Sequence, residues 1–415
     1  MGESTFVNQA YARPKIAQAS RPKTDWILVG IIIGMTLFGL LMVYSAGPKF
    51  ADAIDVPSDY FLRRQVMWAG VGLVTALFLS RFPYQRFQRL TVPMMAVTIG
   101  ALLLTALIAD RTLGANRSLI SGSIRPSELA KLVAILYVAV WLNAKRDVLN
   151  DLSMGLIPLM LILGVTGGLI MWQPDFSAAV TVVMLGGILF FLAGGAWRQI
   201  AMTVAAASLI IWIVVLVYPT GAQRVGDYWS GLNNPLDASY HVRRSLEAII
   251  NGGVFGVGIA HGSTKFTGLP VAPTDSIFAV IAEELGLIGS GLVILAFLVL
   301  LWRGLQIAER AQDPFGSLLA SGITIWIVLE ALLNMAVMVN LLPQAGNALP
   351  FISYGGSNLT MTLAGIGILM NIARQSSGSK NSKQGGSTFG AVVDMRWRDR
   401  GGRIPRAGRT PGSKR

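Results

Sequence analysis

The fold class of this chain is decided by one stretch near its start, Trp26–Ala46, with the sequence WILVGIIIGMTLFGLLMVYSA. The stretch carries no charged residue, and a helix needs about 20 such apolar residues to cross a hydrocarbon core ~30 Å thick. Only helices and closed barrels span a membrane, because every backbone polar group must find a partner within the protein. A barrel strand would alternate polar and apolar residues, which this run does not. The stretch therefore predicts a membrane-spanning helix.

Further apolar runs follow along the chain and predict an all-α, polytopic membrane protein with about ten transmembrane helices. The expected spans are 26–46, 65–80, 91–109, 127–143, 154–172, 176–194, 199–218, 276–301, 315–338 and 358–373. Gln173-Pro174-Asp175 separates the fifth span from the sixth. If these two were one helix broken at the proline, the number of spans and every later orientation would change.

The composition supports a membrane protein and excludes several kinds of site. Of the 415 residues, 53% are hydrophobic and 13% are charged, whereas soluble domains carry about 25% charged residues. The chain has no cysteine and two histidines, which excludes disulfides and thiolate chemistry and argues against a histidine-rich metal site. The net charge of +13 is concentrated toward the tails, where it sets topology or contacts anionic lipid. We therefore do not expect nucleic acid as a partner.

The segments outside the spans predict three regions: a cytoplasmic tail (1–25), a transmembrane domain (26–373) and a disordered basic tail (374–415). The first tail lacks the apolar core and cleavage site of a signal peptide, and the last has too few apolar residues to fold. The positive-inside rule favours cytoplasmic N- and C-termini. This orientation leaves one long loop, 219–275, outside the membrane between spans 7 and 8. Loops of this length usually have a function or are disordered.

Ionisable residues gather near the outer ends of the spans, where charge is costly and suggests function. Glu128 and Lys131 are three residues apart, so they share a helix face and can pair. Such a pair can simply order the helix, or Lys131 can face a polar cavity. Asp175 and Asp275 each precede a span, where a carboxylate can either cap a helix or take part in chemistry.

Two further groups of charged residues carry alternative interpretations. Glu283 and Glu284 lie ~12–14 Å beyond Asp275 along its span, where a bond to a neighbouring helix is the more ordinary role. The outer basic residues suit a lipid diphosphate, because guanidinium groups match phosphate oxygens. Snorkelling to lipid headgroups would explain them equally well. These basic residues are Arg63, Arg64, Arg117, Arg125, Arg243, Arg244 and Lys265.

Taken in order, the motifs of the chain resemble those of the SEDS proteins (shape, elongation, division and sporulation). The resemblance covers residues 26–373 and is specific because all of the motifs occur together. They are FLRRQ (61–65), GANR (114–117), PSELAK (126–131), QPDF (173–176), GGVFGVG (252–258), TDSIFAV (274–280), EELG (283–286) and LPFISYGGS (349–357). The polar tails and the glycine-rich run favour the division type over the elongation type.

The resemblance implies a peptidoglycan glycosyltransferase of the bacterial cytoplasmic membrane, which joins lipid II units into glycan strands. It implies a class B penicillin-binding protein as partner, together with other division proteins and membrane lipids. No cofactor is identified, and whether a divalent cation is required stays open. The family's catalytic aspartate maps to Asp275. The expected substrate contacts are Arg64, Arg117, Glu128, Lys131, Asp175, Arg243, Arg244 and Lys265.

The chain also departs from the family pattern, and two rival functions stay open. The departures include Ser118, Arg125, Ser177, His241, Pro273, Ser276 and Glu330. Because the acidic residues are retained, we expect the chemistry to be intact. A lipid II transporter would need access from both sides around a midplane site, whereas the charged clusters lie mostly at outer ends. A non-catalytic division scaffold would not need Asp275.

Overall fold

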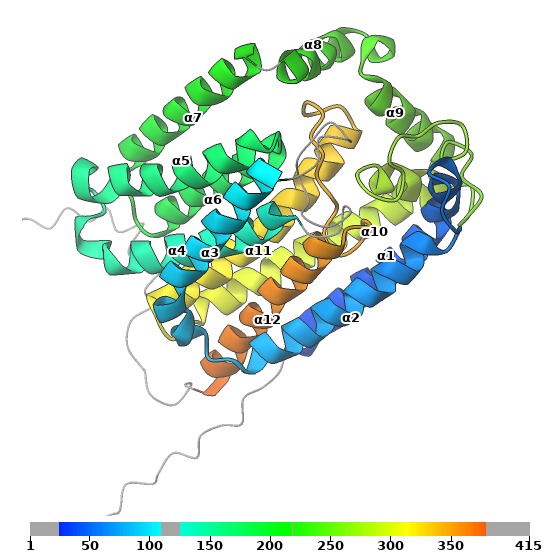
Figure 1. Ribbon diagram of the computed structural model, residues 1–415. Helices are drawn as coiled ribbons and strands as arrows, with labels where there is room; N and C mark the ends of the chain where they lie inside the picture. The colour runs from blue at the N-terminus through cyan, green and yellow to red at the C-terminus, as the bar shows by residue number, and fades with distance from the viewer. Residues whose placement is uncertain (1–24, 109–124, 218, 379–415) are drawn as a thin grey trace, which may run out of the picture. The chain divides into compact units, whose positions relative to one another are not determined.

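The computed structural model describes residues 25–108, 125–217 and 219–378, which belong to one compact unit of the chain (Figure 1). Within these residues the regular structure is helical, and no strand occurs. The helices are α1 (Trp26–Ala53), α2 (Tyr60–Arg81), α3 (Phe87–Ile108), α4 (Pro126–Ala144), α5 (Ile157–Trp172), α6 (Phe176–Leu192), α7 (Trp197–Val217), α8 (Pro219–Asn233), α9 (Tyr240–Gly252), α10 (Ile277–Glu309), α11 (Pro314–Met338) and α12 (Gly356–Gly378).

Each expected span overlaps one of the helices α1–α7 and α10–α12, although the bounds differ by up to several residues. Residues 109 and 218, which end two expected spans, lie outside the described residues. Among the described residues, seven helical segments are long and apolar enough to cross a membrane. They are Trp26–Ala53, Tyr84–Leu107, Pro126–Ala144, Leu152–Trp172, Ile277–Glu309, Pro314–Met338 and Gly356–Ser376, and Phe176–Leu192 is apolar but shorter. The all-α, multi-pass architecture is confirmed, while the count of ten spans stays a prediction.

The helices α5 and α6 form an antiparallel hairpin rather than one broken helix. A Cβ added at Gly167 would meet Val183, and a Cβ added at Gly186 would overlap Leu163. The residue numbers therefore run in opposite directions across the contact. The turn between the helices is polar, and the buried Gln173 amide donates to the Leu102 carbonyl at 2.8 Å.

The core of the bundle lies among α4, α11 and α12, while α1 and α10 turn apolar side chains outward. Trp326 on α11 is completely buried. In contrast, Leu37 on α1 and Leu292 on α10 are both 61% exposed. Apolar side chains on the outer surface of a polytopic helical protein are expected to face lipid, because there the hydrocarbon replaces a protein partner.

The segment 219–275, expected as a long loop, contains helical structure: α8, the short 3₁₀ helix Pro235–Asp237, and α9. α9 begins at the cap Ser239, whose hydroxyl accepts from the Val242 amide. One face of α9 is buried and the other carries charge, as expected for a short helix resting on a protein surface.

The glycine-rich run 252–258 explains a break in α10 at Gly286, where the backbone takes a φ of 68°. Such a break frees carbonyl groups inside a span, and these must be satisfied by other parts of the protein. The amides of Val257 and Gly258 bond the carbonyls of Glu283 and Glu284 at 3.0 and 2.9 Å. A Cβ at Gly256 would overlap the Glu284 carbonyl. Glycine is therefore needed for close approach of the two backbones.

Candidate active site

A polar pocket lies where four helices begin: α4, α6, α10 and α12. Its lining includes residues 274–275 and 355–358 and the residues Arg125, Glu128, Lys131, Asp175, Ser177 and Ala178, with Glu330 contributed by α11. Because these are all N-terminal ends, four helix dipoles direct their positive ends toward the pocket. The cavity volume of ≈ 70 Å³ is smaller than the roughly 300–1,000 Å³ of drug-sized pockets. The cavity therefore has room only for a small group of a ligand, and the rest of a large ligand would lie outside.

Lys131 lines this pocket and lies between two carboxylates. Its Nζ is 2.7 Å from Glu128 Oε2 and also bonds Glu330, and the Lys131 residue is 3% exposed. Asn358 from α12 donates to Glu128 at 3.1 Å and to Glu330 at 3.4 Å. The Glu128–Lys131 pair expected from spacing is confirmed, and Lys131 also faces the cavity. One ammonium between two carboxylates leaves this cluster with a formal charge of −1.

Asp175 both caps a helix and lines the pocket, so its two expected interpretations are compatible. Its carboxylate accepts from the Ala178 amide at 3.4 Å and thereby caps α6. The other carboxylate oxygen accepts from the Ser127 hydroxyl at 3.0 Å. Asp175 thereby links the starts of α4 and α6 beside Lys131.

Asp275 also lines the pocket and lies directly before Ser276, which is the N-cap residue of α10. Asp275 is partly exposed. Its carbonyl accepts from Asn334 at 2.8 Å, and the Thr274 carbonyl accepts from the Ser353 hydroxyl at 2.7 Å. Two different elements, α11 and the turn before α12, therefore fix the backbone that carries this carboxylate.

The basic residues expected near the substrate are only partly brought together. The exposed Arg125 lines the pocket. Arg64 on α2 bonds the Tyr60 hydroxyl and lies 5.2 Å from the Tyr60 ring. It also interacts electrostatically with Tyr354, a pocket residue. Arg117 lies outside the described residues.

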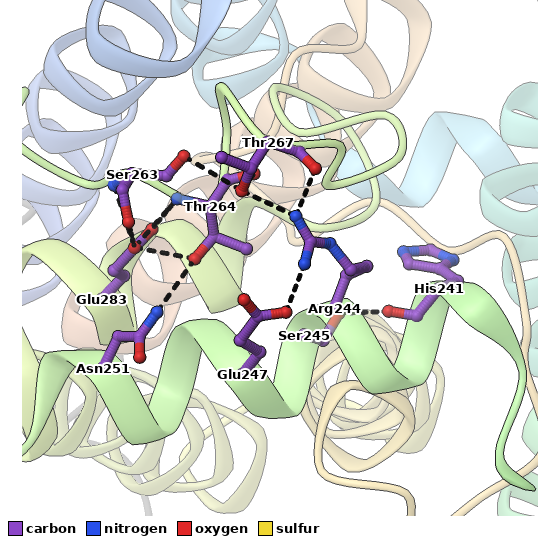
Figure 2. A network of polar contacts seen from close by, with 9 residues as sticks. All are labelled: His241, Arg244, Ser245, Glu247, Asn251, Ser263, Thr264, Thr267 and Glu283. Carbon is purple, nitrogen blue, oxygen red and sulfur yellow. Dashed lines mark hydrogen bonds and ion pairs between the residues drawn. The ribbon is translucent and has the colours of Figure 1, made fainter. Parts of the chain in front are cut away.

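Three other expected substrate contacts do not line the pocket. Arg244 on α9 is bound by Glu247 and by Thr267, whose hydroxyl accepts at 2.6 Å (Figure 2). Arg243 is exposed and donates to the Leu236 carbonyl. Lys265 is buried and bonds Glu284 at 2.5 Å. Its ammonium is therefore engaged in an internal ion pair.

The carboxylates Glu283 and Glu284 bond the loop that precedes α10. Glu283 accepts from the Thr264 hydroxyl at 2.7 Å and from the Ser263 amide at 2.9 Å (Figure 2). Glu284 binds Lys265 and accepts from the Ser45 hydroxyl of α1 at 2.6 Å. The expected bond to a neighbouring helix is confirmed for Glu284, which contacts α1, whereas Glu283 bonds the loop instead. They hold the loop 253–276 against α1 and α10.

Glu330 and Asn358 are pocket residues that sequence reasoning did not include among the site residues. Glu330 carried a signal, because a carboxylate inside the apolar run 315–338 is costly unless it is paired. Asn358 carried none. In the described part of the chain, no group of three or more His, Asp or Glu side chains is arranged to hold a metal ion.

Fold and site together define a polytopic helical membrane protein with an acidic, ion-paired pocket at one end of its helices. The family model of the FtsW/RodA/SpoVE cell cycle proteins matches residues 25–378, and the chain belongs to this family.

Curated relatives extend over most of the chain. A "Probable peptidoglycan glycosyltransferase FtsW" of Trichlorobacter lovleyi is 38% identical over 84% of this chain and 93% of the relative. The "Stage V sporulation protein E" of Bacillus subtilis is 34% identical over 85% of this chain and 97% of the relative.

Solved structures share the fold. A chain from a peptidoglycan synthase complex, described as coordinating polymerization and crosslinking, has a TM-score of 0.67 at 25% identity and covers 85% of this chain and 98% of its own. The rod shape determining protein RodA of Thermus thermophilus has a TM-score of 0.63 at 24% identity, over 85% of this chain and 97% of that one.

Proposed function

We propose that this chain is a peptidoglycan glycosyltransferase that polymerises lipid II into glycan strands during division or elongation, with Asp275 as general base. The observation that carries the proposal is that Asp275 lines the same pocket as the buried ion-paired cluster of Lys131, Glu128 and Glu330. The name of the Trichlorobacter lovleyi relative supports the same reaction.

In the proposed reaction, the 4-hydroxyl of the acceptor sugar attacks the anomeric carbon of the donor. The Asp275 carboxylate takes the hydroxyl proton as the new carbon–oxygen bond forms. The bond between the anomeric carbon and the lipid diphosphate breaks, and the electron pair leaves with the diphosphate. Negative charge therefore grows on the leaving group, where cationic groups and helix N-termini are most stabilising.

Arg125 is suited to this leaving group because it lines the pocket and its side chain is exposed. Lys131 has a different role, since its ammonium is already shared by two carboxylates. We assign to Lys131 and Glu128 the ordering of the cavity, and to Arg64 and Arg117 additional contacts to the substrate. A contact with Arg243 or Arg244 would need substrate to extend over α9.

The test is synthesis of glycan chains by the purified full-length protein from labelled lipid II, with and without its partner. Asp275→Asn should insert and fold normally but lose polymerisation by ~100-fold or more, in the range of a missing general base. Asp237→Asn is the matched control, because Asp237 is an exposed carboxylate of the same outer segment. Normal synthesis by Asp275→Asn would exclude Asp275 as the base and leave Asp175 or Glu128 as the next candidate. No synthesis by the unmodified protein with its partner would instead favour a transporter or a scaffold.

We also propose that both termini are cytoplasmic, so that the pocket opens on the outer side where lipid II headgroups are polymerised. The helices α4, α6, α10 and α12 would be spans 4, 6, 8 and 10, which all begin outside in that topology. A reporter fused after Lys383 should be found inside, and one placed within 233–238 outside. The reverse result for either reporter would refute this orientation.

The proposed partner is a class B penicillin-binding protein, in line with the similarity to a chain of a peptidoglycan synthase complex. Its transmembrane helix could approach α10 closely at Gly291, where an added Cβ meets nothing within 4 Å. Small residues allow such contact between membrane helices. Gly291→Leu should weaken co-purification of the partner, whereas unchanged recovery would remove this surface as the contact.

A further inference from the structure

The turn that precedes α10, Pro270–Ser276, takes a strained conformation. Val271 has a φ of 43°, in the left-handed region that a β-branched residue rarely adopts. Strain of this kind persists only where surrounding contacts hold the backbone in place. Within the turn, the Ser276 hydroxyl donates to the Pro270 carbonyl at 2.6 Å. This bond joins the two ends of the turn that carries Asp275.

Ser276 is in turn held by His241, which lies on α9. His241 Nε2 is 2.5 Å from Ser276 Oγ, and His241 Nδ1 is 2.7 Å from the Gln344 side-chain nitrogen. An amide nitrogen can only donate, so Nδ1 accepts and the ring proton must lie on Nε2. The hydrogen bonds then run in one direction, from Gln344 through His241 and Ser276 to Pro270. Such a chain fixes the orientation of each member.

The surroundings keep His241 in this neutral form. The side chain is buried, and burial together with the charge of Arg224 lowers the pKa of His241 to about 4. At neutral pH the imidazole therefore donates through Nε2 to Ser276. A proton on Nδ1 would face the Gln344 amide donor, which opposes protonation.

We propose that His241 and Ser276 act together as positioning residues for Asp275. The inference rests on the proposed role of Asp275 as general base. A base must lie within ~2.6–3.2 Å of the proton that it takes, and a displacement of about 1 Å can reduce the rate ~100-fold. Ser276 adjoins Asp275 in the chain, so its bond to His241 sets where the carboxylate stands. Both residues are departures from the family pattern, and they contact each other.

The test compares four variants of the full-length protein, each assayed for initial rate of glycan synthesis over a range of lipid II concentrations. His241→Leu and Ser276→Ala should each lower kcat by ~10-fold or more, with KM within ~2-fold, because the base is misplaced but the substrate still binds. The double variant should be no more than ~2-fold slower than either single variant, since both changes break one chain of bonds. His241→Gln should recover most of kcat, because its amide can donate to Ser276.

Ser245→Ala is the matched control. The Ser245 hydroxyl lies on the same buried side of α9 and donates to the His241 carbonyl (Figure 2). It also contacts Met338 Sδ. Its kcat should stay within ~2-fold of the unmodified protein. An equal loss in Ser245→Ala would mean that any change in α9 disturbs activity and would overturn the proposal.

Asp275→Asn, assayed in parallel, separates the two proposals. An active Asp275→Asn protein would show that Asp275 is not the general base. An inactive Asp275→Asn protein beside fully active His241→Leu and Ser276→Ala would overturn only the positioning role. If His241→Leu does not fold, Ser276→Ala decides, because it removes a single oxygen atom.

Discussion

Replacing Lys131 by methionine is the most direct perturbation of the pocket. The substitution keeps a long apolar stem but removes the ammonium between Glu128 and Glu330, at 2.7 Å from the first. Both carboxylates are nearly inaccessible to water, with exposed fractions of 8% and 2%. After the substitution, only Asn358 would still donate to them both.

Breaking a buried ion pair by removing one partner typically costs about 3–5 kcal/mol. Because Lys131 serves two carboxylates, we expect a loss near 5 kcal/mol, partly relieved if one carboxylate takes up a proton. Lys131→Met/Glu330→Gln leaves one uncompensated carboxylate instead of two, so it should regain part of that stability. It should not regain polymerisation, since the charge pattern of the pocket is still changed.

The assay is thermal unfolding in detergent alongside glycan synthesis from lipid II. Lys145→Met is the matched control, because Lys145 is exposed at the other end of the same helix and should change stability by less than about 0.5 kcal/mol. A Lys131→Met protein with the thermal stability and activity of the unmodified chain would refute the reasoning. So would a Lys145→Met protein that is destabilised to the same degree as Lys131→Met.

Three further outcomes follow from the described contacts. The pKa of His241 is lowered in the folded state from 6.5 to about 4, so between these pH values the unfolded chain binds the proton more tightly. The free energy of unfolding should therefore decrease as the pH falls from 6.5 toward 4, by up to about 3 kcal/mol. Thermal unfolding at pH 7 and pH 5 should show this loss, and the loss should be smaller in His241→Gln. An equal loss in His241→Gln would mean that other groups cause the effect. Arg125→Gln should raise KM for lipid II by ~10-fold with stability unchanged, as expected for a lost charge-assisted contact to the diphosphate, and an unaltered KM would remove Arg125 from the site. Lys265→Met should lower thermal stability by about 3–5 kcal/mol because Glu284 is left buried without its cation, whereas a stable protein with a raised KM would make Lys265 a substrate contact after all.

The spans could be predicted from sequence because membrane burial imposes a local requirement. About 20 apolar residues in a helix satisfy their own backbone hydrogen bonds, whatever the rest of the chain does. The pairing of Glu128 with Lys131 was predictable for the same reason, since spacing of three along one helix fixes their separation. The position of Asp175 directly before α6 was also predictable, because Gln173-Pro174-Asp175 separates two apolar runs of the sequence.

Tertiary structure decided what these local features contact. Glu330 reaches Lys131 from 199 residues away, and Lys265 turns inward to Glu284 instead of outward to substrate. No periodicity encodes such contacts, because they depend on how separate helices pack against one another. The same holds for His241 and Ser276, which lie 35 residues apart and meet only because α9 rests beside the start of α10. The sequence by itself determined the helices and the ends at which charge gathers. Packing determined which of those charges face the pocket and which are neutralised inside the protein.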